Sequence, residues 1–297
     1  MQRREFIGLF GGAVAWPVAS RAQSKLPVIG LLYNGTQQSA PSRVAALRQG
    51  LKETGYVEGD NVAFEYRWSE GQEDRLPAMV AELIDRKVAV IYANSINAAL
   101  AAKAATETIP IVFLSAGDPV EDGLVTSFNR PGGNATGIRL FNADIVAKRL
   151  QLLHDLVPAA SSVGFLVRSS NPTSPLQKKS VQSAAATIGL RVLVLEADEE
   201  QGFDQAFANL AAQKVDALLV GTDSYFVTFR EGLIRRAARD RLPAMYDFSI
   251  FAASGGLISY GTSLDDANRL MASMLAGFLK ARSLPSCRSC SPRSSNS

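Results

Sequence analysis

Small polar side chains gather where the predicted strands of this 297-residue chain end. In chain order the segments that follow the strands read NGT (34–36), NSIN (94–97), SAGDP (115–119), RSSN (168–171), GTDSY (221–225) and YD (246–247). Carboxyl ends of parallel strands meet at one edge of a sheet, and ligands of such sheets bind beyond that edge. Amides, hydroxyls and carboxylates at this edge indicate a site that binds a small molecule.

Three of these segments contain an aspartate, and several lead directly into a predicted helix. Asp118 and Asp223 can accept hydrogen bonds from an ammonium group, and the N–H groups at a helix start can receive a carboxylate. The rings of Tyr225, Phe226 and Tyr246 can enclose an aromatic group. The predicted ligand is a small zwitterion or carboxylate with an apolar or aromatic part. The same polar residues also cap helices. Asp118 suits a helix cap because a proline follows it, and its place at a strand end also allows contact with a ligand.

Patterns that support catalysis are missing from the sequence. His154 is the only histidine; it lies on or near the apolar face of a predicted helix, where structural packing is the expected role. No G-x-S-x-G segment accompanies it, and no phosphate-binding G-x-x-x-x-G-K-[ST] segment occurs. The glycine-rich RPGGNATG (130–137) follows no predicted strand, and no cluster has metal-ligand spacing. We expect neither enzyme activity nor a cofactor.

Short apolar runs alternate with helical patterns along most of the chain. The run 26–33 predicts a buried strand, 41–55 a helix that buries Val44, Leu47 and Leu51, and 61–68 a second strand. This alternation continues to residue 281 and is typical of parallel β-α-β units. It pauses at the turn-rich segment 129–137.

The two halves of the sequence share one order of elements. VIGLLYN (28–34) and VGFLVRSSN (163–171) are each followed by a helix, a glycine stop and another strand, so Asn34 and Asn171 occupy equivalent places. We therefore predict an α/β fold of two similar Rossmann-like lobes with parallel sheets and a ligand cleft between them. The first lobe would span 26–137, with 255–281 returning toward it, and the second 138–254, with the junction near 129–143.

The first residues resemble an export signal. Arg3 and Arg4 precede an apolar run that ends in Ser20-Arg21-Ala22, which predicts a twin-arginine signal peptide over 1–22 and a mature protein in the periplasm. A membrane anchor is the alternative, but the run is shorter than the ~20 apolar residues of a spanning helix. The net charge of the whole chain is +3, and residues 1–22 and 282–297 together carry more positive charge than that. The body is not basic, so no nucleic acid partner is expected.

Longer segments resemble one known family. RREFIGLFGGAVAWPVASRAQ, LRQGLKETGYVEGDNVAFEYRWSEG, RLPAMVAELI, IPIVFLSAGDPVEDGLVTSFNRPGGNATG, KRLQLLHDLVP and GGLISYGTSL are similar to the substrate-binding proteins of ABC transporters, in the subfamily that includes binders of tryptophan and other aromatic amino acids. The resemblance implies a type I periplasmic binding protein, a monomer that captures a solute by lobe closure. It also implies delivery to an inner-membrane permease powered by a separate ATPase. The binding positions implied are Asn34, Thr36, Ser95, Asp118, Asn171, Thr222, Asp223 and Tyr246.

Two other classes of protein remain as alternatives. A two-lobed ligand-sensing domain has the same fold and would need an attached DNA-binding or membrane segment. An α/β hydrolase or dehydrogenase would need a nucleophile with its base, or a phosphate-binding loop. Stabilisation by a ligand without turnover would separate a binder from an enzyme.

The last residues, 282–297, differ in composition from everything before them. They hold both cysteines, Cys287 and Cys290, in a Ser/Arg-rich tail. Read in the neighbouring frame, one allowed choice of codons for ARSLPSCRSCSPRSSNS yields GEKPAELPVLQSPKFELV, which resembles the continuation found in the family. We predict a single-base deletion near the codon for Ala281 and a weakened, aggregation-prone protein; a natural disordered tail is the alternative.

Overall fold

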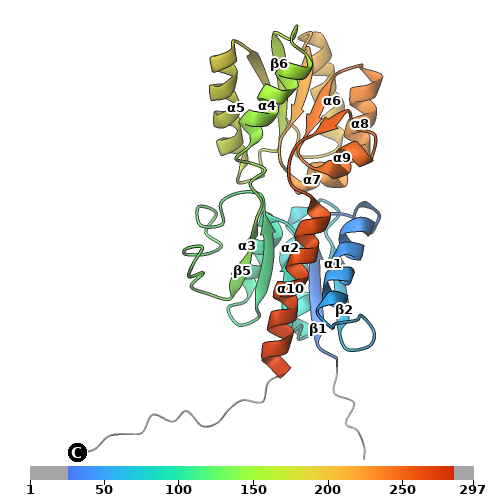
Figure 1. Ribbon diagram of the computed structural model, residues 1–297, viewed down its shortest axis with the longest axis vertical. Helices are drawn as coiled ribbons and strands as arrows, with labels where there is room; N and C mark the ends of the chain where they lie inside the picture. Colours follow the sequence, from blue (N-terminus) through green and yellow to red (C-terminus); the bar gives the residue numbers. More distant parts are fainter. Residues whose placement is uncertain (1–25, 284–297) are drawn as a thin grey trace, which may run out of the picture.

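The computed structural model describes residues 26–283, which form two lobes placed end to end (Figure 1). The predicted signal peptide, 1–22, lies outside these residues, and so does the predicted frameshifted tail from residue 284 onward. Within the described range no helix is both long and apolar enough to cross a membrane.

The first lobe is built on a parallel sheet in the order β2-β1-β3-β4-β5. Its strands are β1 (Val28–Tyr33), β2 (Ala63–Trp68), β3 (Val90–Ala93), β4 (Ile111–Ser115) and β5 (Ala135–Arg139). The connecting helices are η1 (Gln37–Ser39), α1 (Pro41–Glu53), η2 (Glu73–Arg75), α2 (Leu76–Asp85) and α3 (Ile96–Ala105).

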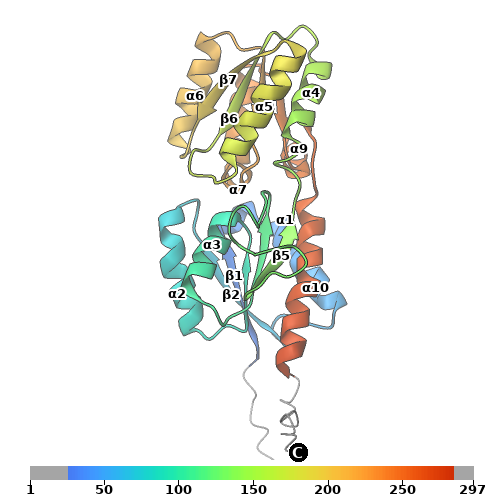
Figure 2. The same ribbon diagram turned by 90° about the vertical axis from the view of Figure 1, so that its left-hand side faces the viewer.

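The second lobe repeats this arrangement, with a parallel sheet in the order β10-β9-β8-β6-β7. Its strands are β6 (Ser162–Val167), β7 (Arg191–Glu196), β8 (Ala217–Val220), β9 (Ala244–Tyr246) and β10 (Ile258–Ser259). Its helices are α4 (Val146–Leu156), α5 (Ser174–Ile188), α6 (Gln201–Ala212), α7 (Ser224–Thr228), α8 (Arg230–Arg239) and α9 (Ser249–Ala253). Each sheet has helices on both faces (Figure 2). The predicted α/β fold of two similar lobes is confirmed.

Two details of the sequence-based outline differ from the structure. The segment 129–137, expected to be only a turn cluster, ends in strand β5, which pairs with β4 from Ile111↔Ala135 onward. The segment from residue 255 was expected to return toward the first lobe, but β10 still pairs with β9 in the second sheet. Strand β5 is short, shows no clear alternation of apolar and polar residues and lies at a sheet edge.

The chain passes between the lobes twice, after β5 and after β10 (Figure 1). After the second passage, α10 (Leu264–Ser283) lies along the first lobe and packs against α1. The two helices approach closely because Gly50 has no side chain: a Cβ there would lie 2.6 Å from the Arg269 carbonyl oxygen. The predicted apolar face of α1 is buried, with Leu47 and Leu51 inside the core.

Asn142 ties the two passages together. Its Nδ2 donates to the Asp247 carbonyl at 3.1 Å, and its Oδ1 accepts from the Thr262 backbone N–H at 3.1 Å. Gly261 is required beside it, since a Cβ at that position would lie 2.6 Å from the Asn142 amide. These contacts fix the crossing segments against one another just below the carboxyl end of the second sheet.

Candidate functional site

A cavity lies where the carboxyl ends of the two sheets face each other, and both lobes and α10 line it. Its volume is about 50 Å³, which is room for roughly four water molecules. The structure therefore has closely apposed lobes, and a solute of amino-acid size can enter only when they separate.

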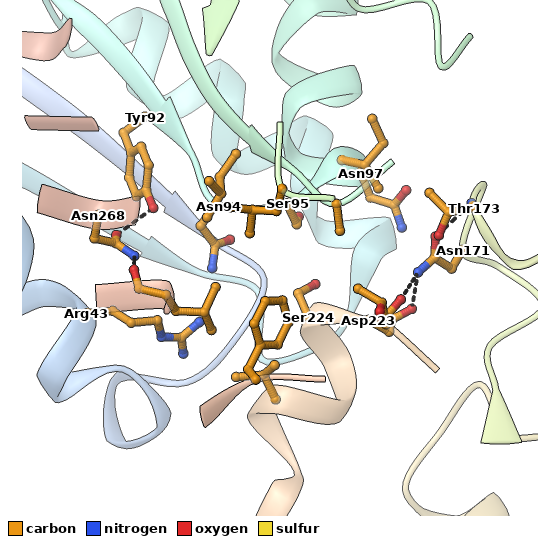
Figure 3. A pocket seen from close by; sticks show the side chains of 18 residues that line it. Arg43, Tyr92, Asn94, Ser95, Asn97, Asn171, Thr173, Asp223, Ser224 and Asn268 are labelled. Atoms are coloured by element: carbon orange, nitrogen blue, oxygen red, sulfur yellow. Dashed lines mark hydrogen bonds between the residues drawn. The ribbon is translucent and has the colours of Figure 1, made fainter. Parts of the chain in front are cut away.

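The first lobe contributes the residues that link β3 to α3. Ser95 has extended backbone and caps α3, its hydroxyl accepting from the Ala98 N–H at 3.2 Å. Asn94 accepts from the backbone N–H of Asn34 at 2.8 Å, and Asn97 lies in the first turn of the helix. All three polar side chains border the cavity (Figure 3). The N-terminus of α3, with its positive dipole end, is therefore part of the wall and favours an anionic group.

The second lobe contributes a buried carboxylate held by an amide. Asp223 caps α7 through the Tyr225 N–H at 2.7 Å and accepts from Asn171 Nδ2, also at 2.7 Å. Asn171 Oδ1 in turn accepts from the Thr173 backbone N–H and hydroxyl, at 2.9 Å each. Burial raises the pKa of Asp223 above its usual range, while Arg168, 3.6 Å away, opposes the shift. A cation bound at Asp223 would favour the ionised form.

Thr222 lines the cavity next to Asp223 and rests on a buried arginine. Its hydroxyl accepts from Arg149 Nη2 at 2.9 Å, and its backbone N–H donates to Gln177 Oε1 at 2.8 Å. Asp247 is completely buried near Arg149, and neither of its carboxylate oxygens has a hydrogen-bond partner within the described chain. The cavity wall at Thr222 is thus supported by the buried guanidinium of Arg149.

The far end of the cavity is formed by Arg43, Tyr92 and Asn268 (Figure 3). Tyr92 Oη donates to Asn268 Oδ1 at 2.7 Å, and Asn268 Nδ2 donates to the Leu264 carbonyl at 2.7 Å. Arg43 Nη2 donates to the Ser39 carbonyl at 2.9 Å. Burial lowers the pKa of the Arg43 guanidinium. Apolar side chains also line the cavity, namely Leu114, Leu140, Val227, Phe248 and Leu264.

Four of the eight predicted site residues line the cavity, and four lie elsewhere. Ser95, Asn171, Thr222 and Asp223 border it. Asn34 lies behind the wall, where its Oδ1 accepts from Ser69 at 2.8 Å and its Nδ2 donates to Ser224 at 3.2 Å.

The other three of those predicted residues have local structural contacts. Thr36 forms a capping box with Ser39 at the start of η1. Asp118 accepts from the Val120 N–H at 2.8 Å and pairs with Arg139 at 3.0 Å, so it caps a turn. Tyr246 is buried inside the second lobe and stacks on Phe251 with 4.6 Å between ring centroids.

The aromatic rings expected to enclose a ligand do not face the cavity. Phe226 is buried against Phe203, and Tyr225 packs against Phe229 at 4.5 Å. The rings that do border the cavity are Tyr92 and Phe248. His154 is half-buried on α4 and does not border this cavity. In the range 26–283, no group of three His, Cys, Asp or Glu side chains could hold a metal ion.

Sequence reasoning missed Arg43, Thr173 and Asn268 as lining residues, while Asn94 and Asn97 line the cavity within the predicted segment 94–97 but were not among the eight positions. Arg43 and Asn268 each interrupt an otherwise apolar helix face, which is the signal that could have found them. On α1, Arg43 is one turn from buried Leu47, and on α10, Asn268 is one turn from buried Ala272.

Contacts across the gap hold the lobes together around the cavity. Arg168 Nη1 of the second lobe pairs with Glu73 Oε1 of the first at 2.8 Å, and Arg230 Nη1 donates to the Ser39 carbonyl at 3.3 Å. Gly71 lies so close to Tyr225 that a Cβ would be 2.5 Å from the ring. Two lobes that meet over a cavity lined by both of them form the arrangement of a protein that encloses a small molecule.

The comparisons with known proteins assign the family. A model described as ABC transporter substrate binding protein matches residues 36–287, and the chain belongs to that family. This confirms the resemblance seen in the sequence.

Individual relatives agree with this assignment. A tyrosine-binding protein of Clostridioides difficile (strain R20291) is 29% identical over 213 residues, which are 72% of this chain and 61% of that protein's length. A crystal structure of the ABC domain in complex with L-Trp from Streptococcus pneumonia has a TM-score of 0.76 and 23% identity, covering 86% of this chain and 85% of that one. A conserved domain protein from Vibrio cholerae has a TM-score of 0.78 and 23% identity, covering 86% of each chain.

Proposed function

We propose that this chain is the solute-binding component of an ABC importer and captures an amino acid or a related aromatic or carboxylate compound between its lobes. The observation that carries the proposal is the cavity between the two sheet edges, lined by polar side chains of both lobes. The tyrosine-binding relative and the relative solved with L-Trp support an aromatic amino acid as the solute.

The chemistry of the cavity supports a zwitterionic head group. Asp223 presents a buried carboxylate that an ammonium group can neutralise, and Asn171 fixes its orientation at 2.7 Å. The N-terminus of α3, with Ser95 and Asn97, offers N–H and side-chain donors for a carboxylate. The apolar middle of the cavity would receive the side chain. Thr222 completes the wall next to Asp223.

The transport role follows from the family. The captured solute would be delivered to an inner-membrane permease driven by a separate ATPase, and the protein itself would act as a monomer in the periplasm without catalysing a reaction. The segment 1–22 would direct export through the twin-arginine route before it is removed.

Ligand-dependent stabilisation tests the proposal. We expect one or a few members of a panel of amino acids and aromatic acids to raise the melting temperature, since a ligand at 100 times its Kd adds about 2.7 kcal/mol to the free energy of unfolding. Calorimetry then gives Kd, and chromatography of the recovered ligand shows whether it is unchanged. Failure of the whole panel, or conversion of the ligand, would contradict the proposal.

The tail remains a separate hypothesis. A single-base deletion near the codon for Ala281 would replace the family's final strand and helix by residues 282–297. Sequencing of the gene tests the deletion directly. A chain with the restored frame should melt at a higher temperature, and equal melting of the two chains would argue against the predicted weakening.

A further inference from the structure

Arg43 is a buried cation that no carboxylate neutralises. Arg43 is 4% exposed and lines the cavity. Its Nη2 donates to the Ser39 carbonyl, and its Nε has no hydrogen-bond partner among the described residues. Among residues 26–283 no carboxylate lies within 4.0 Å of the Arg43 guanidinium. Asp265, in the first turn of α10, interacts with it electrostatically from a greater distance. Leaving a charge buried and unpaired costs several kcal/mol, so such a group needs a reason to be there.

A second arginine makes the local excess of positive charge larger. Arg230 of the second lobe is also buried, and its Nη1 donates to the same Ser39 carbonyl at 3.3 Å. It too has no carboxylate within 4.0 Å in the described part of the chain. Arg43 lies in the first turn of α1, where the helix dipole adds a further positive potential. Arg43, Arg230 and the dipole of α1 therefore all make the electrostatic potential at this end of the cavity more positive.

The opposite charge lies at the other end. Figure 3 shows the Arg43 guanidinium beside Tyr92 and Asn268 on one side, and the Asp223 carboxylate beside Asn171 on the other. Apolar side chains such as Leu114 and Val227 lie along the cavity. An α-amino acid carries its ammonium and carboxylate on one carbon atom, so a head group bound at Asp223 and α3 directs its side chain toward Arg43.

We propose that Arg43 recognises an oxygen at the end of the solute's side chain, a phenol or a carboxyl group, and so determines which amino acid is bound. Tyr92 and Asn268 lie beside this oxygen and complete the polar end. This inference rests on the proposed function and specifies the substrate class of the same site.

The physical consequence is discrimination between isosteric solutes. A site built to hydrogen-bond a substrate oxygen rejects the analogue that lacks it, because the buried donor is then left unpaired. L-tyrosine and L-phenylalanine differ by this one oxygen, and 4-carboxy-L-phenylalanine replaces it by a full anion. A purely apolar pocket would bind phenylalanine at least as well as tyrosine.

Calorimetric titration of the whole chain with these three amino acids tests the inference. We expect both oxygen-bearing ligands to bind at least about ten-fold more tightly than phenylalanine at pH 7.5. Equal or tighter binding of phenylalanine would overturn the inference and leave the proposed function intact. If none of the three binds and no other amino acid does, the proposed function and the inference fall together.

The variant Arg43→Met assigns the preference to the guanidinium. We expect the ratio of the phenylalanine Kd to the tyrosine Kd to fall to within about three-fold of unity, and Arg43→Lys to restore part of the preference for tyrosine. Arg48→Met is the matched control, since Arg48 lies on the same helix but is exposed and pairs with Glu58 at 2.6 Å. A preference that survives Arg43→Met contradicts the inference. If that variant does not fold, the wild-type ligand series decides alone.

Discussion

Glu73 and Arg168 meet across the gap between the lobes, with 2.8 Å between Oε1 and Nη1. Glu73 begins η2 in the first lobe, and Arg168 follows β6 in the second. Arg168 is almost fully buried and also lies 3.6 Å from Asp223, which lines the cavity. The contact between the lobes and the candidate binding site are therefore linked through one guanidinium.

Glu73→Gln should weaken solute binding, because it weakens a contact that holds the two lobes together. The substitution keeps the shape of the side chain but removes the charge, and the pair forms only when the lobes are together. We expect a loss of about 1 kcal/mol, the scale of a partly exposed ion pair, which is about a five-fold higher Kd in calorimetry.

The control for this change is Glu82→Gln. Glu82 pairs with Arg67 at 2.6 Å inside the first lobe, so it carries a similar ion pair that does not bridge the gap. Its Kd should equal that of the wild type. A Glu73→Gln protein that binds as tightly as the wild type would show that the ion pair contributes nothing to closure.

Gly117→Ala should hold the lobes apart. A methyl group at Gly117 would collide with Cγ2 of Thr173 in the second lobe and come 2.9 Å from Asp122 Oδ2. The backbone at Gly117 is outside the left-handed region, so alanine is tolerated while the lobes are separated. Because overpacking costs about 1–3 kcal/mol, we expect about ten-fold weaker binding and a larger radius of gyration in X-ray scattering with ligand present.

Thr173→Ser supplies the compensating change. It removes the Cγ2 methyl but keeps the hydroxyl that donates to Asn171 Oδ1 at 2.9 Å. The double variant should regain most of the lost affinity. If Gly117→Ala alone binds normally, or if the second substitution restores nothing, steric contact at this position does not control closure.

The sequence specified the fold well because its signals are local. Buried runs such as 28–33 and the glycine after α5, which has a left-handed backbone with φ of 73°, mark where elements begin and end. The shared order of elements in the two halves was enough to predict two equivalent lobes. Strand β5 was missed because its residues follow a turn cluster and lie at the edge of the sheet.

The site was predicted less completely because a binding wall depends on distances between distant segments. Strand ends supplied Ser95, Asn171 and Asp223, since parallel strands converge at one edge. Arg43 and Asn268 reach the cavity from two helices that are neighbours only in three dimensions. A polar residue on an apolar helix face marks such a position, but the sequence does not say which cavity it faces.

Asp223→Asn should separate the binding of ammonium from the capping of α7. In the wild type the Tyr225 N–H donates to the Asp223 carboxylate at 2.7 Å. Asparagine keeps an oxygen that can accept this hydrogen bond, so the cap of α7 is retained. The charge that would pair with an ammonium is lost. We expect an amino-acid ligand to bind about 30-fold more weakly, equivalent to about 2 kcal/mol, in calorimetry.

A deaminated ligand is the control for this prediction. An acid such as 3-(4-hydroxyphenyl)propionate has no ammonium group, so its affinity should not fall when Asp223 loses its charge. The free variant should melt somewhat lower than the wild type, because its Nδ2 would face Asn171 Nδ2, which now donates to the carboxylate at 2.7 Å. An equal loss of affinity for both ligands would assign Asp223 a purely structural role.

Asp247→Asn should change how stability depends on pH. Burial raises the pKa of the Asp247 carboxyl to about 7, against a weaker opposing effect of Arg149. The unfolded chain releases this proton near pH 4, while the folded chain retains it up to about pH 7. The folded state therefore binds more protons between these values, and the free energy of unfolding falls as pH rises through that window.

Asparagine cannot ionise, so the variant does not lose this part of its free energy of unfolding as the pH rises. We expect Asp247→Asn to melt at nearly the wild-type temperature at pH 4, and at a progressively higher temperature than the wild type up to pH 7, beyond which the difference stays constant. Asp122, whose pKa is raised to about 6 by burial, titrates in the same window but is present in both proteins, so it cancels in the comparison. Thermal melting curves of both proteins, recorded in a fixed concentration of urea at several pH values, measure the difference in melting temperature. A constant offset from pH 4 to pH 8 would mean that Asp247 has an ordinary pKa in the folded protein.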